Sequence, residues 1–123
     1  MRIGIDIDGV LTDIEQWQLD IRFLTDKDNE NGKRMKKTVT NWLNKYNIYY
    51  DKIIFSPEEK LDICMANNIE LMIEDKVDNI NKISKHIPVI CFDARYNQEC
   101  KGKNIYRCYS WYDIYAKIKK IKN

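Results

Sequence analysis

Short apolar runs recur along the chain at the spacing expected of β-strands. Isoleucine occupies every second position from residue 3 to residue 7, and this alternation predicts a strand that ends at the turn dipeptide Asp8-Gly9. Four later apolar runs predict further strands, at residues 52–55, 70–73, 88–92 and 104–107. The first of these four stops at Ser56-Pro57, because proline cannot continue a strand.

Apolar residues three or four positions apart predict helices between these strands. The expected helices cover residues 12–24, 36–46, 57–67, 75–86 and 111–121. Ser56 occupies the N-cap position of the third helix, with Pro57 at its first helical position and Glu59 at the capping-box position. Residues 26–34 are polar, and we expect a loop there.

The order of these elements predicts the fold class. Strands that alternate with helices of this length indicate βαβ units and a parallel sheet with right-handed crossovers. The expected fold is therefore α/β, a three-layer sandwich around a parallel sheet of four to five strands. The chain has 123 residues, which predicts a single domain over residues 1–123. A domain of this size buries roughly two-thirds of its surface, enough for one core without disulfides or a structural metal.

The balance of charge and hydropathy argues against several classes of protein. The 21 basic and 19 acidic side chains leave a net charge of +2, which does not favour a nucleic-acid polymer as the partner. No apolar run approaches the roughly 20 residues of a bilayer span. The N-terminal stretch also carries carboxylates that a secretory signal lacks. We therefore expect no membrane association and a cytoplasmic protein.

Four cysteines raise the question of disulfides and zinc. Cys64 and Cys91 lie within apolar patterns and are expected to be buried, reduced thiols. Cys100 and Cys108 lie in a stretch expected to be a polar loop, where a bridge between them is the alternative to free thiols. With His86 as the single histidine, the available ligands do not favour a zinc site.

Acidic residues follow two of the predicted strands. Asp6 and Asp8 come at the end of the first strand, and Glu74 and Asp75 follow the strand at 70–73. The carboxyl ends of parallel strands meet at one edge of the sheet, where ligands bind in open α/β folds. Carboxylates gathered there repel one another, since two unit charges 4 Å apart cost about 1 kcal/mol even in water. With oxygen ligands alone, the expected compensating cation is Mg²⁺.

The first of these strand ends resembles a known motif. The run IGIDIDGVLTD at residues 3–13 is similar to motif one of the haloacid dehalogenase-like (HAD) superfamily, a hydrophobic strand followed by DxDG. The resemblance implies that Asp6 is a nucleophile that forms an aspartyl-phosphate and that Asp8 is the general acid and base. Gly9, which permits the tight turn that follows, is a candidate for binding phosphate. The alternative is that Asp6 and Asp8 form an ordinary strand-end and helix-cap pair.

Two further segments are similar to motifs of the same superfamily. The run LMIEDKVDN at residues 71–79 resembles motif four, which implies four metal-binding residues: Asp6, Asp8 through its backbone carbonyl, Asp75, and Glu74 as a ligand or an outer carboxylate. Lys60, in SPEEKLDIC, stands where the lysine of motif three neutralises the nucleophile and the phosphate. The alternatives are that Asp75 is a helix cap and that Lys60 is a solvated helix lysine.

Within the superfamily, the chain resembles the 5′-nucleotidase, deoxy (pyrimidine) type branch and its uncharacterised bacterial relatives. The match depends on the runs WLNKYNIYYDKIIFSPEEKLDIC, IEDKVDN, ICFDARYN and RCYSWYDI. The helical cap of that family, and its motif-two strand with a terminal Thr or Ser, have no recognisable counterpart. Thr25 is the nominal match for the phosphate-binding hydroxyl. Ser56 is the alternative, if the strand at 52–55 pairs with the first strand and brings Ser56 and the following helix N-terminus near Asp6.

A cap-less protein of this kind has no lid of its own to exclude water. By the resemblance, we expect it to act on large substrates or to use a neighbouring subunit of a homo-oligomer as the lid. Aromatic residues expected at the surface agree with a homo-oligomer, although aromatic residues are also common in protein cores. These residues are Trp17, Tyr49, Tyr50 and Tyr109.

The sequence and its resemblance together predict a magnesium-dependent phosphatase. The expected substrate is a small-molecule phosphomonoester, a nucleotide or a sugar phosphate, hydrolysed through an aspartyl-phosphate on Asp6. The alternative is a catalytically reduced HAD-like domain that acts as a binding or regulatory module, because motif two is not recognisable. A receiver domain like those of response regulators also has acidic strand ends and Mg²⁺. Its phosphoacceptor follows a middle strand, however, whereas DxDG follows the first strand here.

Overall fold

The computed structural model describes residues 1–7, 10, 30–54 and 59–122 of the chain. These residues fall into two compact units. The larger unit combines the segments Met1–Ile14 and Glu59–Asn123, and the smaller unit is Glu15–Glu58. The larger unit contains the sheet.

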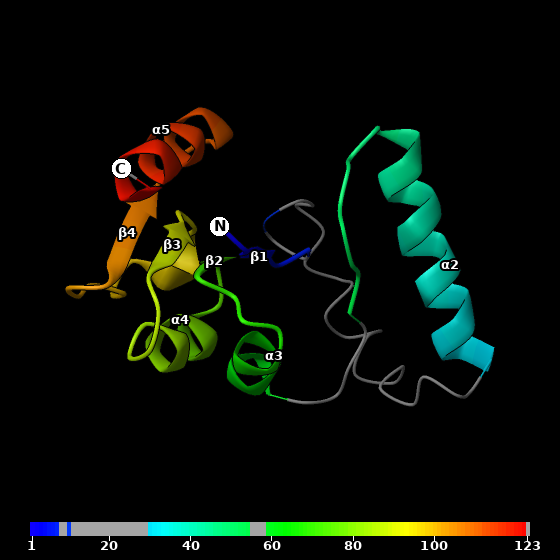
Figure 1. Ribbon diagram of the computed structural model, residues 1–123, viewed down its shortest axis with the longest axis horizontal. Coiled ribbons are helices and arrows are strands. Elements are labelled where there is room, and N and C mark those ends of the chain that lie inside the picture. The colour runs from blue at the N-terminus through cyan, green and yellow to red at the C-terminus, as the bar shows by residue number, and fades with distance from the viewer. Residues whose placement is uncertain (8–9, 11–29, 55–58, 123) are drawn as a thin grey trace. The chain divides into compact units, whose positions relative to one another are not determined.

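A four-stranded parallel sheet forms the centre of the larger unit (Figure 1). Its strands lie side by side in chain order: β1 (Ile3–Ile5), β2 (Leu71–Glu74), β3 (Val89–Phe92) and β4 (Ile105–Cys108). Each neighbouring pair is parallel, and the register aligns Ile5 with Ile73 and Glu74 with Cys91. The parallel sheet confirms the predicted α/β class, and four of the predicted strands are formed.

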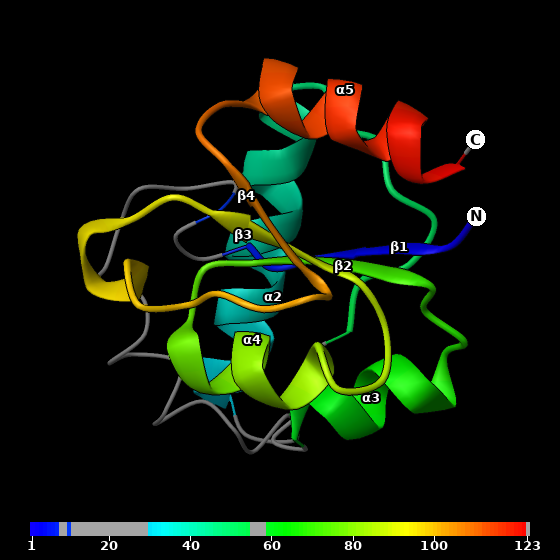
Figure 2. The same ribbon diagram turned by 90° about the vertical axis from the view of Figure 1, so that its left-hand side faces the viewer.

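Helices cover both faces of this sheet, as Figure 2 shows. The helices α3 (Lys60–Ala66) and α4 (Val77–Ile83) lie on one face, and α5 (Trp111–Lys122) lies on the other. A 3-10 helix, η1 (Arg95–Asn97), follows β3. The two helical layers and the sheet between them form the predicted three-layer sandwich.

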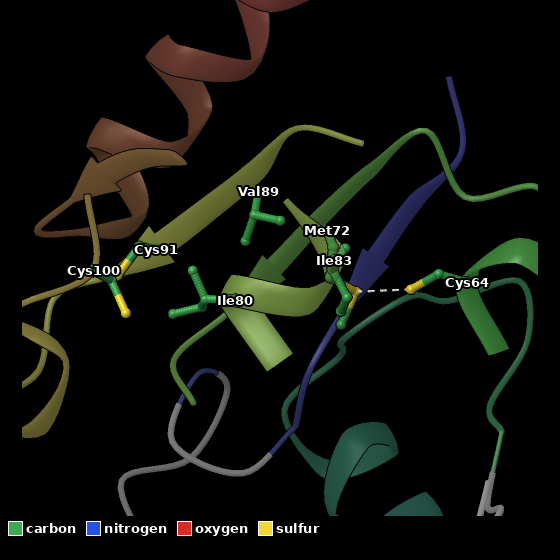
Figure 3. Packing of buried hydrophobic residues seen from close by; sticks show 7 residues of the cluster. All are labelled: Cys64, Met72, Ile80, Ile83, Val89, Cys91 and Cys100. Carbon is green, nitrogen blue, oxygen red and sulfur yellow. Dashed lines mark hydrogen bonds between the residues drawn. The ribbon is translucent and has the colours of Figure 1, made fainter. Parts of the chain in front are cut away.

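The sheet face towards α3 and α4 is packed with sulfur-containing and branched side chains (Figure 3). The buried residues of this cluster are Cys64, Met72, Ile80, Ile83, Val89, Cys91 and Cys100. The Cys64 thiol lies 3.8 Å from the Met72 sulfur, to which it donates a weak hydrogen bond. Gly4 leaves room for the Met72 side chain, because a Cβ at position 4 would lie only 2.6 Å from that sulfur.

The opposite face of the sheet is packed against α5. Its buried residues are Val10, Leu71, Ile73, Ile90, Cys108 and Ile114. Because successive residues of a strand point to opposite faces, Leu71 and Ile73 face α5, while Met72 and Glu74 face α3 and α4. The alternation along β2 therefore directs a carboxylate, Glu74, towards the N-terminus of α3.

The smaller unit contains the helix α2 (Glu30–Lys45). Val39 and Leu43 are buried, and the rings of Trp42 and Tyr46 pack with their centroids 5.1 Å apart. The turn after the helix places Asn47 at a φ of 54°, a conformation that asparagine tolerates better than most residues. The four-residue spacing of these apolar positions is the pattern that predicted a helix here.

Three predicted boundaries are wrong. Residues 30–34, expected to be a loop, belong to α2, because Glu, Lys and Arg extend a nucleated helix at little cost. Residues 52–54 are not in a strand, since a short apolar run forms one only where a neighbouring strand can pair with it. The helix expected from residue 57 begins at Lys60, with extended Glu59 as its N-cap, so Glu59 is not at a capping-box position. The predicted helix at 12–24 lies outside the described residues.

The prediction of a polar loop is wrong for Cys108 and half right for Cys100, which lies in a loop but is buried. Cys100 is 3% exposed and packs in the cluster below β3, and Cys108, 1% exposed, is the last residue of β4. Thiols behave as small apolar groups, so a polar neighbourhood in the sequence does not keep them at the surface. All four cysteines are free, as predicted for Cys64 and Cys91.

The expectations for the surface are confirmed where they fall on described residues. Tyr49, Tyr50 and Tyr109 are exposed, while Trp17 lies outside the described residues. None of the helices in the described ranges combines the length and the apolar character that a bilayer crossing requires.

Candidate active site

Three carboxylates converge at the carboxyl ends of β1 and β2. Asp6 follows β1, Glu74 ends β2 and Asp75 comes next in the chain. One carboxylate oxygen from each lies within 4.8 Å of those of the other two. The backbone N–H of Asp6 donates to the carbonyl of Ile73 at 3.0 Å, which continues the β1–β2 pairing up to Asp6 itself. Strand pairing therefore brings the two acidic segments together, as expected for the carboxyl edge of a parallel sheet.

Glu74 is buried and engaged with its own chain through both carboxylate oxygens. Its Oε1 accepts the backbone N–H groups of Asp75 and Lys76 at 3.0 and 3.2 Å, and its Oε2 accepts the Asn79 side-chain amide at 3.3 Å. Burial, and after it the negative charge of Asp6, raises the pKa of Glu74 to about 8. Through these hydrogen bonds, Glu74 stabilises the conformation of the loop after β2.

Asp75 is also buried, but its two carboxylate oxygens differ in their hydrogen bonding. Its Oδ2 accepts a short hydrogen bond from the Tyr96 hydroxyl, whereas its buried Oδ1 has no hydrogen-bond partner within the part of the chain that the structure describes. Burial raises the pKa of Asp75; the Tyr96 hydrogen bond opposes this shift, and the charge of Asp6 adds to it. Asp75 is not the cap of α4, because the N-cap residue is Lys76.

Lys60, the first residue of α3, supplies the positive charge of the cluster. Its ammonium donates to Oδ1 of Asp6 at 2.6 Å and lies 3.6 Å from Oε2 of Glu74. Burial acts to lower the pKa of Lys60, but the charges of Asp6 and Glu74 outweigh it and raise that pKa. With its pKa raised, Lys60 is a protonated cation, and its side chain is 30% exposed.

The donor set fits a hard divalent cation. Among the described residues, three carboxylates meet one ammonium. Burial is the main cause of the raised pKa values of Glu74 and Asp75, and the negative charge of Asp6 adds to both shifts, so a dication would favour the ionised form of both groups. Oδ1 of Asp75 is a buried acceptor with no donor among the residues that the structure describes, and such an atom is costly unless something binds it. Oxygen ligands without histidine or cysteine are the set that Mg²⁺ prefers.

The structure brings together half of the residues expected at the site. Asp6, Lys60, Glu74 and Asp75 form one contiguous cluster. The other candidates lie outside the described residues: Asp8, Gly9, Thr25 and Ser56. The expected hydroxyl of motif two and the expected general acid therefore stay predictions.

Two residues of η1 contact the cluster and were not expected from the sequence. The Tyr96 hydroxyl binds the Asp75 carboxylate, and the side-chain amide of Asn97 donates to the Asp75 carbonyl at 2.8 Å. Neither residue belongs to a periodic pattern, because the run DARYN at residues 93–97 is mostly polar and follows β3. Its place directly after β3, at the same edge of the sheet as Asp6 and Asp75, was the available signal.

Comparison with known proteins finds relatives named as nucleotidases. The chain is 28% identical over 118 residues to a nucleotidase of Clostridium acetobutylicum, a match that covers 94% of this chain and 59% of that protein. It is 37% identical over 73 residues to a Bacillus subtilis (strain 168) protein called putative nucleotidase YqfW, which covers 57% of this chain and 38% of that protein. The chain therefore spans little more than half the length of the first relative and less of the second. No protein-family model and no solved structure matches it.

Proposed function

We propose that the chain is a HAD-like phosphatase that hydrolyses a small phosphomonoester with Mg²⁺, through an aspartyl-phosphate on Asp6. The observation that carries this proposal is the position of Asp6, which shares one cluster with Asp75 and accepts a 2.6 Å hydrogen bond from Lys60. The names of the relatives support a nucleotide as the class of substrate. The sequence motif DxDG supports Asp6 as the nucleophile.

The first chemical step transfers the phosphoryl group to the protein. An oxygen of the Asp6 carboxylate attacks phosphorus, a bond forms between them, and the bond from phosphorus to the ester oxygen breaks. The leaving oxygen takes a proton from Asp8, the role that the motif assigns to that residue. The Lys60 ammonium holds one oxygen of the Asp6 carboxylate through a charge-assisted hydrogen bond before the attack.

The second step releases phosphate and restores the protein. Asp8 accepts a proton from a water molecule, the water oxygen attacks phosphorus, and the bond between Asp6 and phosphorus breaks. Asp6 and Asp75 would hold Mg²⁺, whose positive charge would stabilise the phosphoryl oxygens. Lys60 adds its own charge on the side of Asp6, and Glu74 fixes the ammonium of Lys60 and the loop that carries Asp75.

Phosphate release from p-nitrophenyl phosphate and from nucleoside monophosphates tests this function. We expect turnover that needs Mg²⁺ and is abolished by EDTA and by Asp6→Asn. Acid-quenched protein should carry one phosphoryl group by mass spectrometry, and Asp6→Asn should carry none, because the amide is a poor nucleophile.

Asp78→Asn is the matched control, since Asp78 is an exposed carboxylate in the first turn of α4. This variant should retain the wild-type rate. Equal rates for wild type and Asp6→Asn would overturn the proposal. Stabilisation by Mg²⁺ without any phosphate release would instead support a binding or regulatory module.

A further inference from the structure

Two consecutive residues of η1 bind Asp75, one at its side chain and one at its backbone. The Tyr96 hydroxyl donates to the carboxylate at Oδ2, and the Asn97 amide donates to the backbone carbonyl of the same residue at 2.8 Å. Asp75 is separated from them by about twenty positions in the sequence and by the whole of α4 and β3. This short segment therefore fixes both the backbone and the side chain of a residue at the candidate metal site.

Asn97 anchors this segment to the sheet. It is fully buried, and its amide also donates to the Phe92 carbonyl at 2.9 Å, at the end of β3. Its Oδ1 accepts the backbone N–H of Ala94 and one guanidinium N–H of Arg107, each at 3.0 Å. Both amide hydrogens and both lone pairs of Asn97 are thus used, and η1 is fixed to two strands.

Arg107 strengthens the same anchor from β4. Its guanidinium donates to the carbonyls of Asn97 and Cys100 at 2.8 and 3.2 Å, and to the Asp93 carboxylate at 2.8 Å. A planar guanidinium with several good acceptors has little freedom to move. The backbone that carries Tyr96 is therefore held in place independently of any contact at the carboxylate cluster.

This fixed phenol determines which oxygen of Asp75 remains for a ligand. With Oδ2 occupied by Tyr96, the buried Oδ1 is the acceptor that has no partner among the described residues. A carboxylate without the phenol could turn about its χ2 angle, a broad torsion that no staggered well restrains. Outer hydrogen-bond partners orient metal ligands in this way, and their loss commonly costs about 10- to 100-fold in metal affinity.

We propose that Tyr96 is a positioning residue for Asp75: the Tyr96 phenol holds Oδ2 of the carboxylate, so that Oδ1 would be available to Mg²⁺. We infer this on the premise of the proposed function, which places a dication at Asp75. Tyr96 itself is 44% exposed, so removing its hydroxyl leaves the buried core of the protein intact.

The test measures Mg²⁺ affinity in Tyr96→Phe by isothermal titration calorimetry, together with the thermal midpoint in EDTA and in saturating Mg²⁺. We expect the affinity for Mg²⁺ alone to fall about tenfold or more, with little change of the midpoint in EDTA. Tyr112→Phe is the matched control, because Tyr112 is a tyrosine of α5 that is 79% exposed. The control should bind Mg²⁺ as the wild type does.

The outcomes separate this inference from the function on which it depends. Wild type that binds no Mg²⁺ would overturn the proposed function, and the role of Tyr96 with it. Wild type that binds Mg²⁺ while Tyr96→Phe binds it equally well would overturn the role of Tyr96 alone. A lower midpoint in EDTA with unchanged affinity would show a purely structural hydrogen bond and would also overturn it.

Discussion

The ammonium of Lys60 lies 2.6 Å from the Asp6 carboxylate and 3.6 Å from the buried carboxylate of Glu74. One cation from α3 thus pairs with acids that end two neighbouring strands. The geometry follows from the pleat of β2, which turns Glu74 towards the helix layer that contains Lys60. An ammonium in this position pairs with Asp6 and would also attract any anion that approaches Asp6.

Replacing Lys60 should therefore impair catalysis more than folding. In Lys60→Met, we expect kcat/KM for phosphate release to fall about 100-fold or more, the usual cost of losing one charge aimed at the reacting group. Lys82→Met is the matched control, because Lys82 pairs with Glu59 at 3.2 Å where both side chains are more than half exposed. An exposed pair contributes little, so this control should keep its activity. Equal losses in the two variants would contradict the special position of Lys60.

The candidate metal ligands predict opposite effects of Asp75→Asn with and without Mg²⁺. Mg²⁺ at 100 times its Kd should stabilise the wild type by about 2.7 kcal/mol, and Asp75→Asn should lose most of this gain. In EDTA the same variant should be as stable as the wild type or more so, because removing one carboxylate relieves the repulsion with Asp6. Urea unfolding measures the free energy of unfolding of each variant in EDTA and in Mg²⁺, with Asp78→Asn as the exposed control. A variant destabilised equally in both conditions would contradict Asp75 as a ligand.

Among the polar residues of the described fold, Asn97 should cost the most stability when it is substituted. Asn97→Ala removes the partner of the buried Asp75 carbonyl, and of the Phe92 carbonyl and the Ala94 N–H, which are partly buried. A buried group left unpaired costs about 1–3 kcal/mol. We expect a loss of about 3 kcal/mol in the free energy of unfolding, measured with urea. Its neighbour Gln98 also makes two hydrogen bonds, but at the surface, so Gln98→Ala should cost less than about 1 kcal/mol. Similar losses at the two positions would contradict the anchoring role of Asn97.

The apolar periodicity of the sequence predicts most of the described fold because each strand and helix buries one face. The strands β2, β3 and β4 and the helix α5 fall within a residue or two of their predicted limits. The pattern fails where burial does not decide the conformation. The first residues of α2 are polar and still helical, and the apolar run at 52–54 forms no strand.

The site is predictable to the extent that it consists of charges at strand ends. Asp6, Glu74 and Asp75 could be grouped from the sequence because parallel strands deliver their carboxyl ends to one edge. Tyr96 and Asn97 could not be, because their role comes from a tertiary hydrogen-bond network that leaves no periodic trace. A buried asparagine in a polar run looks the same in a sequence as a solvated loop residue.

The buried thiol of Cys91 predicts how the stability of the protein depends on pH in the alkaline range. Burial raises the pKa of Cys91 from 9.0 to about 11, against the opposing charge of Arg107. Below about pH 9 the thiol is neutral in both the folded and the unfolded chain, so its full contribution to stability is present. Between about pH 9 and 11 the unfolded chain has lost the proton that the folded chain still binds. The free energy of unfolding therefore falls as the pH rises, by up to about 1.4 kcal/mol per pH unit from this group.

Cys91→Ala separates this titration from that of every other group. The variant is less stable than the wild type near neutral pH because it loses a buried side chain, and the difference should shrink between about pH 9 and 10.5 as the wild type loses the contribution of the thiol. Val89→Ala, which also shortens a fully buried side chain of β3, has nothing to titrate, so its deficit should stay constant. Urea unfolding with a reductant present measures both deficits at each pH. A deficit of Cys91→Ala that stays as constant as that of Val89→Ala would mean that the thiol ionises equally readily in the folded and unfolded chains.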